Sequence, residues 1–301
     1  MKISNRLVEN VVRRVLLEYG GVSDEILSLA NDIYSKMIAE YNSGRNDWER
    51  LDSIISIDGF EYVKYIYLQL FDNEYVESVN VKLYGYNPRQ TTFMRAYNYL
   101  RRKGMARISY SSLDKCINFF IPFPINGEVT SKARLFIISG LNHEIKHGLR
   151  YVKQLQNLER KGKDFTFDEN YYASVTGVQK GIYGNDENTV LAIKDLYYYL
   201  CTDEIDARLQ SMYVEYSEYM DLSKCRSYYE VKSNEEIYEQ FKYAISISPT
   251  FRKRFDELVR DVFNNRMNAK KFLNYCQKGI NRFDEHLRRI IGRVTYEKRI
   301  N

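Results

Sequence analysis

Residues 143–147 read His-Glu-Ile-Lys-His, a motif that contains two of the three histidines in a chain of 301 residues. On a helix, residues four apart differ by about 40° around the axis, so both imidazoles project from one side and can reach a single ion. Glu144 lies about 60° from His147, within reach of a water beside that ion without being a ligand. The motif therefore predicts a helix on which His143 and His147 bind a metal and Glu144 is a general base.

The residues around the motif support a helix. Apolar side chains recur with helical spacing on the side opposite the two histidines, which predicts a buried face. Gly140 precedes the motif on the metal side, where glycine is costly unless space is needed. We expect that space to hold a substrate or a neighbouring strand. The apolar face is formed by Ile138, Leu141, Ile145, Leu149 and Val152.

A catalytic zinc site needs a third protein ligand and an open position. Lys153 stands where a metzincin would supply a third histidine, which excludes that class. His286 lies in a basic helical tail and is interpreted as a surface residue, so a carboxylate is required. We expect Glu204 to be this ligand, with Asp203 in reserve. The alternative is that both acids only favour the N-terminus of a helix running from an N-cap at Thr202 to Met220.

At this point the chain resembles the gluzincin metallopeptidases, in which a glutamate from a later helix joins an HExxH helix. Glu204-Ile-Asp-Ala207 matches the first four positions of their second motif, whereas Arg208 stands where an acid or amide is usual. The resemblance implies a Zn²⁺-dependent metallopeptidase that hydrolyses peptide bonds with a zinc-activated water. It further implies that Glu144 is the catalytic base, and it favours an endopeptidase over an exopeptidase acting on a peptide or protein substrate.

The segment before the motif predicts a β-hairpin. Residues 106–110 and 117–123 are apolar or aromatic runs separated by a polar turn. Pro122 and Pro124 end the second run or confine it to a sheet edge. In zincins an edge strand near the metal pairs with the substrate backbone. We expect residues 117–123 to be that strand or an ordinary sheet strand.

The whole pattern predicts an α+β fold that is predominantly helical. A zincin-like small sheet with its active-site helix would precede a helical C-terminal lobe, with 44% hydrophobic residues sufficient for a full core. The expected parts are an amphipathic leader helix at 1–21, an α+β lobe at 22–158 and a loop and helical lobe at 159–301. Within the last lobe we expect a loop at 160–188, a helix opened by a capping box at Ser233, another opened by Ser248-Pro249, and a final helix at 269–296.

The first twenty residues form an amphipathic pattern that ends at Gly20-Gly21, which fits either the first helix of a domain or a detachable docking peptide. This segment resembles the leader helices of tailed-phage virion proteins, which implies contacts with capsid or other virion proteins through residues 1–20 and packaging in a phage particle. The four cysteines form no CxxC pair, which favours a reducing, cytoplasmic compartment. No long apolar run or signal-peptide core is present, so we expect no membrane association.

Two other functions stay open on the sequence. Arg208 in the second motif, together with the leader, is compatible with a structural or cargo virion protein whose zinc site is not catalytic. Residues 251–301 carry 14 Lys and Arg against 6 Asp and Glu, so the C-terminal helices suit a nucleic-acid-associated module. Apolar side chains in the same helices favour the simpler interpretation of solvated basic surfaces.

Overall fold

The computed structural model describes residues 23–44, 47–51, 59–70, 73–160 and 186–300. Residues 23–161 belong to one compact unit, and the described residues from 186 onward belong to another. Eight α-helices and five strands occur in the described residues, which confirms the predominantly helical α+β fold class. The leader expected at 1–21 and most of the loop expected at 160–188 lie outside the described residues.

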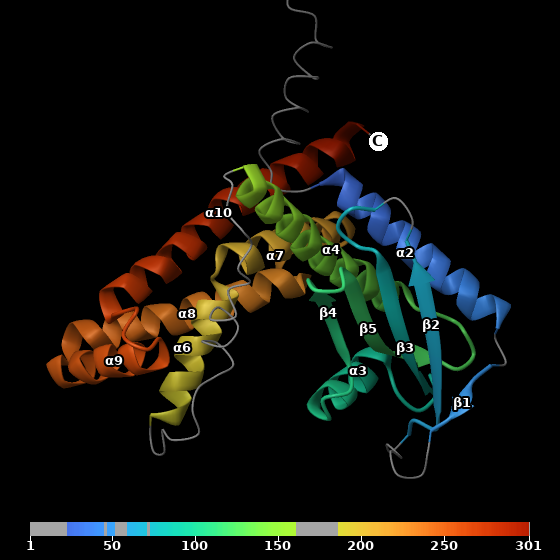
Figure 1. Cartoon of the computed structure of the whole chain (residues 1–301), viewed down its shortest axis with the longest axis horizontal. Coiled ribbons are helices and arrows are strands. Elements are labelled where there is room, and N and C mark those ends of the chain that lie inside the picture. The colour runs from blue at the N-terminus through green and yellow to red at the C-terminus, as the bar shows by residue number, and fades with distance from the viewer. Residues whose placement is uncertain (1–22, 45–46, 52–58, 71–72, 161–185, 301) are drawn as a thin grey trace, which may run out of the picture. The chain divides into compact units, whose positions relative to one another are not determined.

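The first unit is built on a five-stranded mixed sheet (Figure 1). Its strand order is β1-β2-β3-β5-β4, in which β3 and β5 are parallel and every other neighbouring pair is antiparallel. The strands are β1 (Glu49–Arg50), β2 (Tyr62–Gln69), β3 (Ser78–Tyr86), β4 (Arg107–Ser111) and β5 (Cys116–Pro124).

Helices α2 (Asp24–Ser43) and α4 (Ser131–Arg160) pack against each other and contact β2 and β4, respectively. Between them and the sheet lies an apolar core, because alternate residues of each strand face the same side. The ring of Tyr41 in α2 contacts that of Phe123 in β5 in a tilted arrangement, with ring centroids 4.6 Å apart. A third helix, α3 (Phe93–Arg102), is joined to α4 by the edge contact of Tyr97 with Phe136. Fully buried inner-face residues include Val79, Leu83, Ile117, Phe119 and Ile121.

The hairpin predicted from residues 106–123 is confirmed by the antiparallel pairing of β4 with β5. Of the two hairpin strands, however, β4 lies at an edge of the sheet, whereas β5 lies between β3 and β4. Pairing with β4 extends along β5 only as far as Phe120. Pro122 and Pro124 therefore lie beyond the end of β4, where no backbone donor is needed on that side.

The second unit is helical. The N-cap of α7 is Cys201, whose Sγ accepts the amide of Glu204 at 3.3 Å, so the prediction of Thr202 as N-cap was wrong by one residue. Ser233 lies inside α8 with its hydroxyl on the Tyr229 carbonyl, so the predicted capping box was also wrong. Ser248 caps α9 as predicted. The helices are α6 (Glu187–Tyr199), α7 (Thr202–Tyr219), the 3₁₀ turn η2 (Leu222–Lys224), α8 (Arg226–Ile247), α9 (Pro249–Val262) and α10 (Ala269–Ile300).

Among the described helices, none combines the length and the apolar character needed to cross a membrane.

Candidate metal centre

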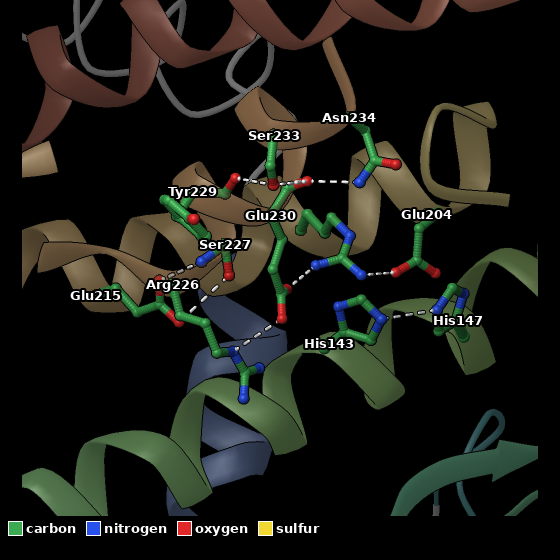
Figure 2. Close-up of polar contacts among 11 residues, drawn as sticks. His143, His147, Glu204, Glu215, Arg226, Ser227, Tyr229, Glu230, Ser233 and Asn234 are labelled. Carbon is green, nitrogen blue, oxygen red and sulfur yellow. Dashed lines mark hydrogen bonds and ion pairs between the residues drawn. The ribbon is translucent and has the colours of Figure 1, made fainter. Parts of the chain in front are cut away.

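The two histidines of the motif lie one turn apart on α4, with their ring nitrogens facing each other (Figure 2). Nε2 of His143 and Nε2 of His147 are 3.1 Å apart, and both side chains are half-buried. Two nitrogens bound to one tetrahedral zinc at about 2.0–2.1 Å are separated by about 3.3–3.4 Å. The spacing in α4 is close to this value, so the pair fits a shared metal ion as the sequence predicted.

Glu144, the predicted general base, is buried with 8% of its surface exposed. Its Oε2 accepts a hydrogen bond of 2.8 Å from the backbone N–H of Tyr110 on β4. Because β4 is the edge strand, this N–H points away from β5 and toward α4. The contact holds the carboxylate against the sheet edge.

Two glycines let α4 lie close to its neighbours. A Cβ built on Gly140 would lie 2.7 Å from Cδ1 of Ile108 on β4, so the space predicted around Gly140 is taken up by a neighbouring strand. A Cβ built on Gly148 would lie 2.7 Å from the backbone oxygen of Tyr75. The Tyr110 hydroxyl donates to that same oxygen at 2.8 Å, so this phenol is engaged in the fold. These contacts fix the helix that carries both histidines against the sheet edge.

Glu204 lies in the first turn of α7 and is 1% exposed. Its Oε1 is 2.6 Å from a terminal nitrogen of Arg208, one helical turn later. The same guanidinium pairs with Glu230 of α8 and lies over the ring of Tyr199 at 4.7 Å. Burial alone would lower the pKa of Arg208, but the carboxylates of Glu204 and Glu230 raise it overall, so the cation is stable.

Asp206 and His286 each lie in surroundings different from those of Glu204. Asp206 forms a two-point ion pair with Arg282 of α10 at 2.7 and 2.9 Å. The structure thus gives Asp206 a role in joining α7 to α10. His286, interpreted from the sequence as a surface residue, is half-buried on α10, where burial and the charges of Arg282 and Arg289 lower its pKa.

His143, His147 and Glu204 form a group that could hold a metal ion. Each offers one ligand atom, and neither Asp203 nor His286 belongs to this group in the described part of the chain. Two imidazole nitrogens and one carboxylate oxygen are a donor set that zinc accepts. The chemistry of the donors therefore fits zinc, and it also fits other divalent ions of similar preference.

Two features of the site were not foreseen. The pairing of Arg208 with Glu204 has a sequence signal, because oppositely charged residues four apart on a helix face each other. The contact of Glu144 with the Tyr110 amide has none, since it depends on which strand forms the sheet edge. No family model, curated protein or solved structure matches this chain.

Proposed function

We propose that the chain is a zinc-dependent metallopeptidase in which His143, His147 and Glu204 hold the metal and Glu144 is the general base. The observation that carries this proposal is the approach of the two Nε2 atoms to 3.1 Å on one helix, beside a buried glutamate that follows the first histidine.

Zinc, when bound, would supply a Lewis acid for the scissile carbonyl of a peptide. Glu144 would take the proton of the attacking water and return it to the leaving amine, a transfer that requires its carboxylate to be ionised. The Tyr110 amide holds that carboxylate at the sheet edge. We infer an endopeptidase acting on a peptide or protein substrate, as the resemblance to the gluzincins implies.

Arg208 would hold the Glu204 carboxylate in position. It takes one carboxylate oxygen, so the metal would be bound through the other. Glu230 offsets the charge of Arg208 and limits the repulsion between the guanidinium and a dication. Groups that orient ligands in this way commonly change metal affinity by about 10- to 100-fold.

The same contact supports a second candidate, a structural or cargo protein of a phage particle with a non-catalytic zinc site. Glu204 already pairs with the cation of Arg208, so a bound zinc ion could stabilise the fold without catalysing hydrolysis. Binding of virion proteins through residues 1–20, and packaging in a particle, belong to this candidate. It predicts the same ligands and no peptidase activity.

Activity and metal content together distinguish the two functions. Purified chain is loaded with zinc, freed of excess metal, and assayed for bound zinc and for cleavage of unfolded protein substrates. A peptidase should bind one zinc, and Glu144→Gln should keep that zinc and lose activity by about 10²-fold or more. Glu159→Gln, an exposed glutamate on the same helix, is the matched control and should retain both. Zinc binding without cleavage by the wild-type chain would exclude the peptidase and favour the structural site.

A further inference from the structure

The sheet of the first unit has a second face, opposite the apolar core, whose side chains alternate with the buried ones. Tyr65 and Tyr67 of β2 are 58% and 62% exposed on this face. Large aromatic side chains at such exposure are uncommon on consecutive outward positions of a strand, because burying them would stabilise the fold. Two exposed tyrosines side by side therefore need an explanation outside the core.

The printed strand register places these tyrosines in rows that run across four strands. Tyr65 pairs with Lys82 of β3, Lys82 with Phe120 of β5, and Phe120 with Arg107 of β4. The row thus alternates aromatic, basic, aromatic and basic. Nζ of Lys82 lies 5.1 Å from the centre of the Tyr65 ring, and the Arg107 guanidinium lies 4.7 Å from the centre of the Phe120 ring.

A second row of outward side chains lies two residues away from the first on each strand, and all its members except the first are polar. It runs from Tyr67 through Asn80 and Asn118 to Ser109. The two amides are in contact, with Asn80 Nδ2 3.4 Å from Asn118 Oδ1. Both amides can donate and accept, which is what is needed to contact the edges of nucleobases.

The charge on this face has one sign. Among outward positions of β2, β3, β4 and β5, the ionisable charges are Lys82 and Arg107, and none of those positions is Asp or Glu. The chain as a whole carries 40 acidic residues, so the lack of acids on four adjacent strands is selective. A surface of flat rings and cations without carboxylates is complementary to a ligand that has flat rings and anions.

We propose that the face formed by Tyr65, Lys82, Phe120, Arg107 and the adjacent row from Tyr67 to Ser109 binds single-stranded nucleic acid. Unpaired bases would stack on the exposed rings of Tyr65 and Tyr67, and backbone phosphates would pair with Lys82 and Arg107. Neighbouring strands lie about 4.8 Å apart and outward residues of one strand about 7 Å apart, so the rings are spaced for successive unstacked bases. A duplex does not fit, because its bases are stacked on each other and hidden from flat surfaces.

This surface is separate from the basic C-terminal helices that the sequence offered for nucleic acid. On those helices, Arg260, Arg289 and Arg293 form ion pairs with acids one turn away. Arg282 is paired with Asp206 in α7. These four arginines are therefore paired within the fold, whereas the two cations of the sheet face lie over aromatic rings.

The test uses the full chain and fluorescein-labelled 12-nucleotide oligouridine and oligodeoxythymidine, followed by fluorescence anisotropy at low and moderate salt. The double variant Tyr65→Ala with Tyr67→Ala should weaken binding by about tenfold or more, because stacking contributes strongly for each base. Tyr229→Ala with Tyr243→Ala removes two equally exposed tyrosines from α8 and is the matched control, expected within about twofold of wild type.

The charges are tested through the salt dependence. Replacing Lys82 and Arg107 by Gln should reduce the slope of log affinity against log salt by about 1.4, because each phosphate contact to a single strand contributes about 0.7. The control, Lys270→Gln with Lys271→Gln on α10, should leave the slope unchanged. An unlabelled single strand should compete better than a duplex of the same sequence.

Several results would overturn the proposal. The first is no binding of either oligonucleotide at low salt, and the second is binding by the Tyr65/Tyr67 double variant that equals wild type. The third is a slope of log affinity against log salt that changes only with the α10 substitutions. A change in sedimentation of the sheet-face variants without a change in oligonucleotide binding would show that a second copy of the chain covers this face. Glu144→Gln should bind as wild type does, so the outcome is independent of peptidase activity.

Discussion

Replacing Arg208 by Met tests how the helical unit tolerates a buried acid before any metal binds. The side chains of Arg208 and Glu204 are 8% and 2% exposed, and their charged atoms are 2.6 Å apart. Met has a similar length and keeps the apolar stem, but it removes the guanidinium that pairs with Glu204 and Glu230. Glu230 is 27% exposed and retains Arg226 nearby, so most of the effect should fall on Glu204.

The expected cost follows from burial. Removing one partner of a buried ion pair typically destabilises a protein by about 3–5 kcal/mol, because the remaining charge loses its solvation and its partner. For a unit of this size, each kcal/mol lowers the melting temperature by about 2–4 °C, which gives a decrease of roughly 6–20 °C. Zinc offers Glu204 another cation, so adding the metal should recover part of this loss.

The assay is thermal unfolding of chelator-treated protein, with and without a small excess of zinc. We expect the zinc-induced rise in melting temperature to be larger in Arg208→Met than in wild type. Arg282→Met on α10 removes an ion pair with Asp206 of α7, but Arg282 is 39% exposed, so the cost should stay at about 1 kcal/mol. A metal-free Arg208→Met protein as stable as wild type, or one that zinc stabilises no further than wild type, would refute this reasoning.

Two further predictions concern the helical unit. Gly279→Ala should destabilise it by about 1–3 kcal/mol in urea unfolding, because the new Cβ would meet the backbone oxygen of Leu200, whereas Gly292→Ala on the same helix meets nothing and should be neutral or slightly stabilising. Burial raises the pKa of the Cys225 and Cys276 thiols to about 12, so both should resist alkylation at pH 9 until the protein unfolds. The folded state holds these protons more tightly than the unfolded chain, whose thiols ionise near pH 9, so stability should fall as the pH rises from about 9 to 12. Rapid labelling of both thiols in the native protein, or constant stability across that range, would contradict this.

The centre could be anticipated to the extent that local spacing determines it. Helical periodicity places His143 and His147 on one side of α4 whatever the rest of the chain does, and the same holds for Glu204 facing Arg208 on α7. The spacing did not reveal the role of Arg208, because the position invited comparison with an acid in a known motif. The positive charge of Arg208 faces the negative charge of Glu204 on the same side of α7. Its role could be recognised only once both side chains were known to be buried.

Features set by tertiary packing were missed. The order of strands decides that β4 is the edge and that the Tyr110 amide reaches Glu144, and no local pattern encodes that order. Cys201 is the N-cap of α7 because its Sγ accepts a hydrogen bond from the Glu204 amide. Threonine is preferred over cysteine at N-caps, which is why Thr202 was predicted. Ser233 fits a capping box in sequence but continues α8, since its hydroxyl can bond a carbonyl of the preceding turn.

The ligand set of the bound metal tests the central proposal most directly. X-ray absorption at the zinc edge, on the full chain loaded with one equivalent of zinc, reports the kind and number of donor atoms. We expect two imidazole nitrogens at about 2.0–2.1 Å with oxygen donors completing the shell, and the loss of one oxygen donor or of the zinc itself in Glu204→Gln. Sulfur at about 2.3 Å, a single imidazole, or a spectrum unchanged by Glu204→Gln would contradict the site formed by His143, His147 and Glu204.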